Sequence, residues 1–125
     1  MKINQLNHTA LPVQNLEKSC QFYQNVLGLA PIARPAFNFP GAWFGMGDQQ
    51  ELHLISKGTI FEVPPLDRHF AFRVDDIHAF AAHLQEQQIE FVGPKCRPDR
   101  ALQIVLRDPD GHVIELCTKP GIAPD

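Results

Sequence analysis

Three histidines and one glutamate lie in segments that the sequence predicts as β-strands, and they are the residues best suited to chemistry. They are His8, His53, His69 and Glu115. Imidazole and carboxylate groups together are typical ligands of divalent Zn, Ni, Fe, Mn and Co, and nothing in their spacing separates these metals. A convergence of all four side chains predicts one divalent metal ion per site.

Alternation along the strands is the reason to expect this convergence, because successive strand residues point to opposite faces of a sheet. In 52–55, 69–74 and 112–117 the bulky apolar residues take every second position, and the histidine or glutamate falls between them. The apolar side suits packing against a helix, so we expect the polar residues on the opposite, concave face. For any one of them alone, the alternative is a solvated or hydrogen-bonded surface group.

The segments that carry these residues occur twice along the chain. HTALPVQNL at 8–16 matches HFAFRVDDI at 69–77 with an offset of 61 residues, and DQQELHL at 48–54 matches DGHVIEL at 110–116 with an offset of 62. A chance similarity between short segments is the alternative, but two nearly equal offsets favour a duplicated unit. The duplication pairs His8 with His69, and His53 with Glu115.

Each copy reads as one strand, one helix and three further strands. In the first copy the helix is predicted from its N-cap Asn15 to Gly28, because apolar residues recur at i, i+4, i+7 and i+11 from Leu16. In the second copy Asp75 or Asp76 caps the helix. The predicted strands are 3–13, 30–37, 41–46 and 51–56 in the first copy, and 68–74, 89–92, 101–107 and 112–118 in the second.

These elements predict an α+β fold with two βαβββ modules in a single domain, residues 1–125. Module one covers about 3–57, a linker covers 57–67, and module two covers about 68–118. Sheets of this kind leave open edges, and open edges tend to pair or to be covered, so we expect a homodimer.

The composition excludes several classes of protein. Lys and Arg number 11 against 14 Asp and Glu, and the net charge of −3 argues against a nucleic-acid partner bound through phosphate neutralisation. No apolar stretch reaches the length of about 18 residues that a membrane span requires. The three cysteines are scattered and form no CxxC pair, which favours a cytoplasmic location.

Residues near the expected ligands suggest how a small-molecule substrate is held. Arg73 is predicted to lie on the same face of its strand as His69. The basic stretch 94–100 is predicted to be a loop that can reach the same region. A local positive field there favours a carboxylate or phosphate on the substrate, and the alternative is an arginine paired with a nearby acid. Phe37 and Trp43 belong to an aromatic hairpin that is either core or pocket wall, and as pocket wall they bind substrate.

Three motifs resemble the vicinal oxygen chelate superfamily, which includes glyoxalase I, fosfomycin-modifying enzymes, extradiol dioxygenases and bleomycin-resistance proteins. They are NHTALPVQNLEKSCQFYQNVLGL at 7–29, HFAFRV at 69–74 and DPDGHVIEL at 108–116. The resemblance covers about residues 3–118. It implies two βαβββ modules whose curved mixed sheets form a cleft, usually within a homodimer.

Members with enzymatic activity hold a divalent metal through the first and last strand of each module. Carried over to this chain, the resemblance implies that His8 and His69 come from the first strands, and that His53 and Glu115 come from the last. Glyoxalase I-like members typically have Glu where this chain has His53.

The leading hypothesis is therefore a metal-dependent lyase or isomerase, similar to glyoxalase I, that chelates a small oxygenated substrate through two neighbouring oxygens. Glu115 is the expected catalytic base, and His53 is the second candidate for moving a proton. An Fe(II) dioxygenase-like enzyme is the alternative among enzymes. A metal-free protein that binds a small molecule, as in bleomycin resistance, is the alternative outside them.

Overall fold

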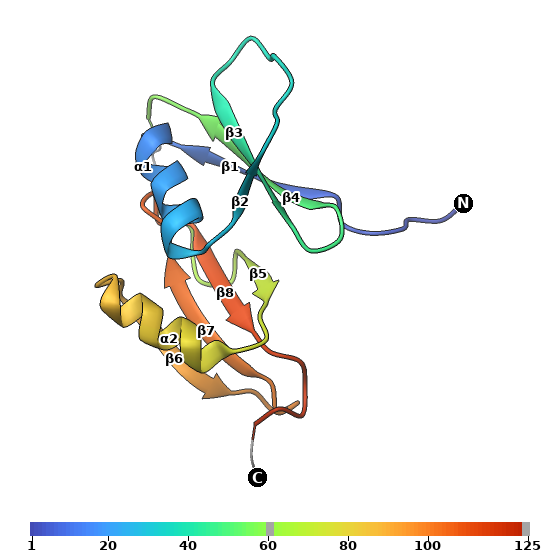
Figure 1. Cartoon of the computed structure of the whole chain (residues 1–125), viewed down its shortest axis with the longest axis vertical. Helices are drawn as coiled ribbons and strands as arrows, with labels where there is room; N and C mark the ends of the chain where they lie inside the picture. Colours follow the sequence, from blue (N-terminus) through green and yellow to red (C-terminus); the bar gives the residue numbers. More distant parts are fainter. Residues whose placement is uncertain (60–61, 124–125) are drawn as a thin grey trace. The chain divides into compact units, whose positions relative to one another are not determined.

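The computed structural model describes residues 1–59 and 62–123, which fall into two compact units, Met1–Glu62 and Val63–Asp125. Within the described residues each unit contains one four-stranded mixed sheet and one helical segment, as Figure 1 shows. The boundary between the units lies in the predicted linker 57–67. The predicted α+β fold of two βαβββ modules is confirmed.

The first unit has its first and last strands side by side in the sheet. Its elements are β1 (His8–Val13), α1 (Leu16–Gln21), the π-helical turn η1 (Phe22–Val26), β2 (Ala30–Ile32), β3 (Gly41–Met46) and β4 (Gln50–Ser56). The strand order is β1-β4-β3-β2, with β1 parallel to β4 and the other pairs antiparallel. This order makes β4 an inner strand, with β1 on one side and β3 on the other.

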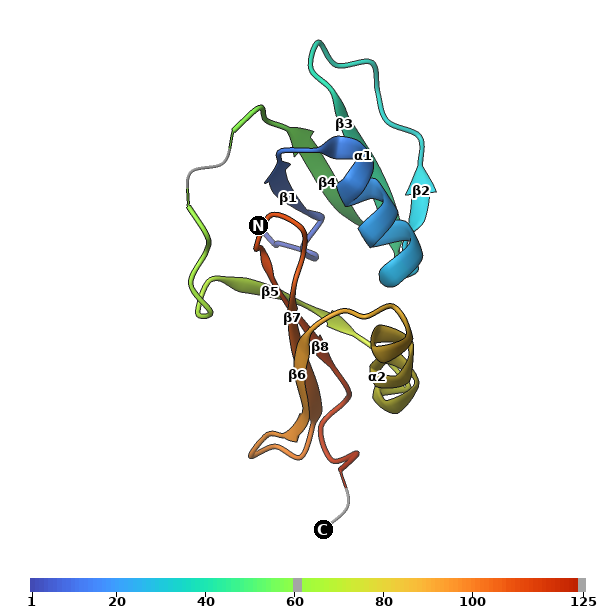
Figure 2. The same ribbon diagram turned by 90° about the vertical axis from the view of Figure 1, so that its left-hand side faces the viewer.

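The helix of this unit begins where the sequence predicts. The Asn15 side chain accepts a hydrogen bond from the Lys18 backbone N–H at 3.0 Å, as an N-cap residue should. The helix lies over one face of the sheet (Figure 2), and the core includes the fully buried Tyr23, Phe44, Leu52 and Leu54. Gly28, at φ +74°, then leads the chain out of the helical turns.

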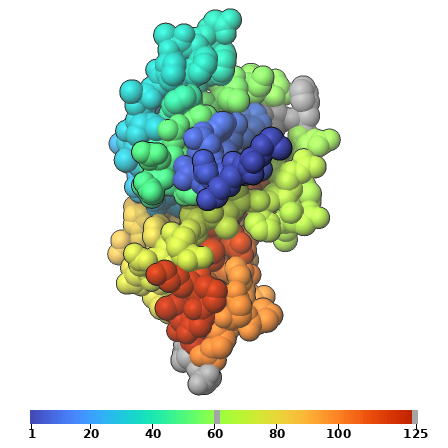
Figure 3. All heavy atoms as spheres, turned by 90° about the vertical axis from the view of Figure 1, so that its right-hand side faces the viewer, coloured from blue at the N-terminus to red at the C-terminus, as the bar shows by residue number. Residues whose placement is uncertain are grey.

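Two strands of this unit are shorter than predicted. β1 begins at His8 instead of residue 3, because its partner strand β4 starts at Gln50 and His8 already pairs with Glu51. Residues 1–7 are exposed and lie on the surface in dark blue in Figure 3. β2 ends at Ile32 instead of residue 37, and Pro35 beyond it lacks the N–H that a ladder requires.

The second unit repeats the same topology. Its elements are β5 (His69–Arg73), α2 (Ile77–Glu86), β6 (Phe91–Cys96), β7 (Leu102–Arg107) and β8 (Val113–Cys117), in the strand order β5-β8-β7-β6. β5 runs parallel to β8. Asp76 caps α2 by accepting from the Ala79 backbone N–H at 3.0 Å, and Ile77 and Leu84 are buried beneath the helix.

β6 is longer than predicted and starts later, so part of the predicted basic loop 94–100 is strand. Its register shifts between Val92 and Lys95, which marks a bulge at Gly93 and Pro94. Among the described residues no helix is long and apolar enough to cross a membrane.

The turn between β7 and β8 fixes where β8 begins. Asp108 is buried, and its carboxylate accepts hydrogen bonds from the backbone N–H groups of Asp110 and His112, both at 2.9 Å. Gly111, at φ +88°, donates its N–H to the Asp108 carbonyl. This arrangement is the turn predicted for DPDG, and it sets the register of the strand that carries Glu115.

Candidate functional site

The first unit brings two of the predicted ligands into contact. His8 on β1 and His53 on β4 stack with ring centroids 4.2 Å apart and an interplanar angle of 17°. On its other side His53 stacks on Trp43, with which it pairs on the neighbouring strand β3. Their ring centroids lie 3.9 Å apart, and the interplanar angle is 1°. The strand parity of His53 is as predicted, because Leu52 and Leu54 on either side of it are fully buried.

Hydrogen bonds hold the two imidazoles of this unit in defined orientations. His53 Nε2 lies 2.8 Å from Glu51 Oε1, and a carboxylate can only accept, so Nε2 carries the proton and Nδ1 keeps its lone pair when the ring is neutral. His8 Nδ1 lies 2.7 Å from the Asn7 side-chain oxygen, and donation to that oxygen leaves Nε2 with the lone pair. Each ring therefore retains one nitrogen that can bind a metal.

Glu51 is a site residue that the sequence interpretation missed. It lies two positions before His53 on the same strand, and therefore on the same face. That parity is the signal that could have identified it.

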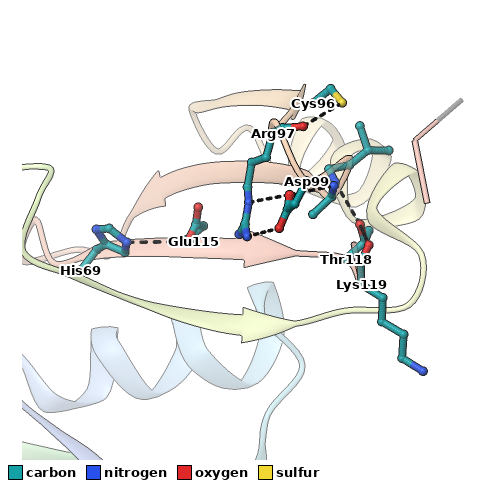
Figure 4. Close-up of polar contacts among 9 residues, drawn as sticks. His69, Cys96, Arg97, Asp99, Glu115, Thr118 and Lys119 are labelled. Atoms are coloured by element: carbon teal, nitrogen blue, oxygen red, sulfur yellow. Dashed lines mark hydrogen bonds and ion pairs between the residues drawn. The ribbon is translucent and has the colours of Figure 1, made fainter. Parts of the chain in front are cut away.

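The second unit brings the other two predicted ligands together. His69 Nε2 on β5 lies 3.6 Å from Glu115 Oε2 on β8. Figure 4 shows the two side chains pointing toward each other. His69 Nδ1 lies 2.9 Å from the Leu66 carbonyl oxygen, which can only accept, so Nδ1 carries the proton. In a neutral imidazole, Nε2 then directs a lone pair toward a carboxylate oxygen, and no hydrogen bond forms between two acceptors.

This pair fits a divalent metal. Two ligand atoms at typical zinc bond lengths, on one tetrahedral or octahedral ion, lie roughly 3.0–3.5 Å apart. The separation of 3.6 Å between His69 Nε2 and Glu115 Oε2 is close to that range. A histidine that donates one N–H to a backbone carbonyl and keeps the other nitrogen free has the usual arrangement of a metal ligand.

The four predicted ligands therefore occur as two pairs, one within each unit. Across residues 1–59 and 62–123, no group of three or more His, Cys, Asp or Glu residues is arranged to hold a metal ion. The convergence of all four side chains on one ion remains a prediction.

Arg97 follows β6 and lies on the same side of its sheet as Glu115. Its guanidinium forms an ion pair with Asp99 at 2.6 Å and is directed toward β8 (Figure 4). The hydrogen bond with Asp99 and the charge of that carboxylate raise the pKa of Arg97, with smaller contributions from Cys117 and Glu115. The same hydrogen bond, followed by the one from the Ala101 N–H, lowers the pKa of Asp99.

The other basic residues of the predicted anion-binding region differ in their exposure and in their hydrogen bonds. Arg73 is exposed at the end of β5 and pairs in register with Cys117 on β8. Lys95 is exposed on β6. The Arg100 guanidinium donates to the Ala123 carbonyl, so it ties down the C-terminal segment.

The aromatic hairpin divides between core and surface. Phe44 is buried in the core. Trp43 lies on the opposite face of β3, where it stacks on His53 of the neighbouring strand β4. Phe37 is 46% exposed and lies 6.0 Å from Trp43 between ring centroids. Both aromatic residues predicted to bind substrate therefore lie outside the core: Trp43 stacks on His53, and Phe37 lies beside Trp43.

One family model, described as the Glyoxalase/Bleomycin resistance protein/Dioxygenase superfamily, matches residues 5–116 of the chain. The chain belongs to this superfamily. The resemblance noted in the motifs at 7–29, 69–74 and 108–116 is confirmed.

Individual superfamily members align over nearly the whole chain. A lactoylglutathione lyase from Neisseria meningitidis is 33% identical over 125 residues, which cover 91% of this chain and 90% of that protein. The metallothiol transferase FosB from Shouchella clausii is 27% identical over 124 residues, covering 93% and 81%. A solved structure described as a glyoxalase family protein from Bacillus anthracis superposes with a TM-score of 0.81 at 30% identity, covering 95% and 98%.

Proposed function

We propose that this chain is a divalent-metal-dependent lyase or isomerase of the glyoxalase I type, acting on a small substrate with two neighbouring oxygens. The observation that carries the proposal is the orientation of His69, whose free Nε2 faces Glu115 Oε2 at 3.6 Å. The lyase and metallothiol transferase relatives support a metal-dependent enzyme of this superfamily.

The residues that would hold the ion are His8, His69 and Glu115, with His53 as the fourth ligand or as a proton-transfer group beside it. Such a set suits Zn, Ni, Fe, Mn or Co. When bound, the ion acts as a Lewis acid that polarises the substrate oxygens. Leu66 and Asn7 orient the two first-strand histidines through hydrogen bonds at 2.9 Å and 2.7 Å.

Proton transfer is assigned to Glu115 and His53. Glu115 Oε2 accepts a proton from a hydroxyl-bearing substrate carbon next to a carbonyl and returns it to the carbonyl carbon. The isomerisation is complete when the hydroxyl proton has moved to the former carbonyl oxygen. His53 Nε2 donates a hydrogen bond to Glu51, so Glu51 fixes the tautomer in which His53 Nδ1 can accept a proton. The two groups supply a base in each unit.

Substrate recognition is assigned to Arg73, Trp43 and Phe37. Exposed Arg73 provides a positive charge for a carboxylate or phosphate on the substrate, and Arg97 beside Glu115 adds to that field. Trp43 and Phe37 provide an apolar wall beside His53.

We further propose a homodimer in the cytoplasm. Each described sheet ends in edge strands, and exposed apolar side chains lie on two of them, Ile32 on β2 and Val92 on β6. Cys20, Cys96 and Cys117 are free thiols, as expected in a reducing compartment.

Elemental analysis of untagged protein, purified without chelators, tests the proposed function. We expect about one Zn, Ni, Fe, Mn or Co ion per chain, and lyase activity on lactoylglutathione, the compound that the name of the lyase relative gives. His69→Gln should lose both, whereas the exposed His78→Gln on α2 serves as the matched control and should keep both. Protein that takes up none of these metals in equilibrium dialysis would instead be a metal-free binding protein.

A further inference from the structure

Residues 33–40 connect β2 to β3 and carry two exposed phenylalanines around one arginine. The guanidinium carbon of Arg34 lies 4.9 Å from the ring centroid of Phe37 and 4.9 Å from that of Phe39. The two rings stack 5.4 Å apart at 25°. A guanidinium within about 6 Å of an aromatic ring is attracted by the negative charge of the ring face. One cation therefore holds both rings.

Arg34 is fixed in place by further contacts with its own loop. Its Nη2 donates to the Phe39 carbonyl oxygen at 2.9 Å. Position 41 must be glycine for this arrangement, because a Cβ there would overlap the Leu54 carbonyl oxygen and lie 3.0 Å from Arg34 Nη2. Arg34 Nε is buried and has no hydrogen-bond partner among the residues that the structure describes, an arrangement that costs stability by itself. The arginine is therefore not explained by hydrogen bonding alone.

The rings held by Arg34 continue into the stack that contains the predicted ligands. Phe37 lies 6.0 Å from Trp43, Trp43 lies 3.9 Å from His53, and His53 lies 4.2 Å from His8. All of these contacts lie within the first unit. A continuous series of contacts thus runs from Arg34 through Phe37 and Trp43 to His53.

We propose that Arg34 is a positioning residue that orders an aromatic wall, Phe37, Phe39 and Trp43, for an aryl or bulky apolar group of the substrate. Phe37 and Phe39 are 46% and 40% exposed, so part of each residue is accessible to a ligand. Rings that are already fixed lose less conformational entropy on binding than mobile ones. The inference rests on the proposed function only in assigning that group to the substrate bound beside His53.

The first test uses the fluorescence of Trp43, the single tryptophan of the chain. Arg34→Met keeps an unbranched stem but removes the guanidinium and its charge, and Arg34→Lys keeps the charge. We expect acrylamide quenching of Trp43 to rise about twofold in Arg34→Met and less in Arg34→Lys, because cation–π attraction is lost in the first variant only. Lys18→Met, which removes an exposed cation from α1, is the control and should leave quenching unchanged.

The second test separates ring recognition from metal binding. Benzohydroxamate and acetohydroxamate present the same pair of oxygens to a metal but differ in a phenyl or a methyl group. We expect metal-loaded protein to prefer the phenyl compound, and Arg34→Met to reduce that preference about fivefold through loss of the cation–π contacts, with partial recovery in Arg34→Lys. Affinity for acetohydroxamate should stay unchanged. An undiminished phenyl preference in Arg34→Met would overturn the inference and leave the proposed function intact.

A third probe, 2-naphthol, is measured by equilibrium dialysis with metal-free protein. We expect saturable binding that weakens about fivefold in Arg34→Met. If neither hydroxamate binds while naphthol binding still depends on Arg34, the metal-dependent function fails and the aromatic wall stands. If naphthol binding is the same in all variants, the wall is not positioned by Arg34.

Discussion

His69 and Glu115 face each other across neighbouring parallel strands, with Nε2 and Oε2 3.6 Å apart, while the other imidazole nitrogen is committed to the Leu66 carbonyl. The geometry leaves a lone pair and a carboxylate oxygen pointing toward the same small region. Without a proton or a cation between them, these two groups repel each other.

The most direct prediction concerns Glu115→Gln. The change keeps the size of the side chain and removes its charge, so we expect affinity for Zn or Co to fall at least about tenfold, a typical effect of disturbing a metal site. Equilibrium dialysis measures it. Glu86→Gln, at the exposed end of α2, is the control. Equal metal affinity in the two variants would exclude Glu115 as a ligand.

A second prediction addresses the tautomer of His53. In the parent protein Glu51 accepts from Nε2, so nitrogen-15 spectra at neutral pH should show Nε2 protonated. In Glu51→Ala that acceptor is absent, and we expect a mixture of the two tautomers. Unchanged spectra would show that Glu51 does not determine the state of this ring.

A third prediction concerns the charge at the end of β5. Arg73→Ala should raise the KM for an anionic substrate about tenfold and change kcat little, as expected when binding is lost equally from the ground state and the transition state. Arg97→Ala should have a smaller effect, because Arg97 is already paired with Asp99. A neutral analogue provides the comparison, and an equal loss for both substrates would argue against a role in anion recognition.

The pair of Arg97 and Asp99 predicts a pH dependence of stability. The pKa of Asp99 is lowered in the folded protein, so its contribution is present above the unfolded value of about 4 and is lost as the pH falls through the lower, folded value. Urea unfolding of the parent and of Asp99→Asn should therefore differ at pH 7 and converge in acid. Because both side chains are partly exposed, we expect the difference to be small and to shrink in high salt.

The homodimer is tested by sedimentation equilibrium at micromolar concentration. We expect a species of twice the mass of one chain. Only the mass of a single chain under these conditions would show that the edge strands are not used for assembly.

Much of the fold could be predicted because the patterns that determine it are local. Leu52 and Leu54 alternate with His53, and the parity that they predict is the one observed, with both leucines buried. The caps Asn15 and Asp76 also act where their positions suggest. These features depend on neighbours in the sequence, and the sequence displays them directly.

The features that could not be predicted depend on contacts between distant segments. The start of β1 at His8 follows from where β4 begins, and no residue near position 3 carries that information. The insertion of His53 between His8 and Trp43 depends on side-chain orientations across three strands. The position of Arg34 between two rings depends on the path of the 33–40 loop and on the space at Gly41.

In each unit the opening strand pairs with the closing one, β1 with β4 and β5 with β8. His8 cannot contact His53 until the chain has been synthesised through β4. In the second unit Glu115 lies on β8, the last strand to be made. Such non-local pairing is slow relative to helix formation. A ribosome-bound fragment that stops short of β4 lacks His53, and one that stops short of β8 lacks Glu115, so neither could retain an ion that needs both members of the missing pair. Retention of a metal ion would then show that the strands of a unit are complete.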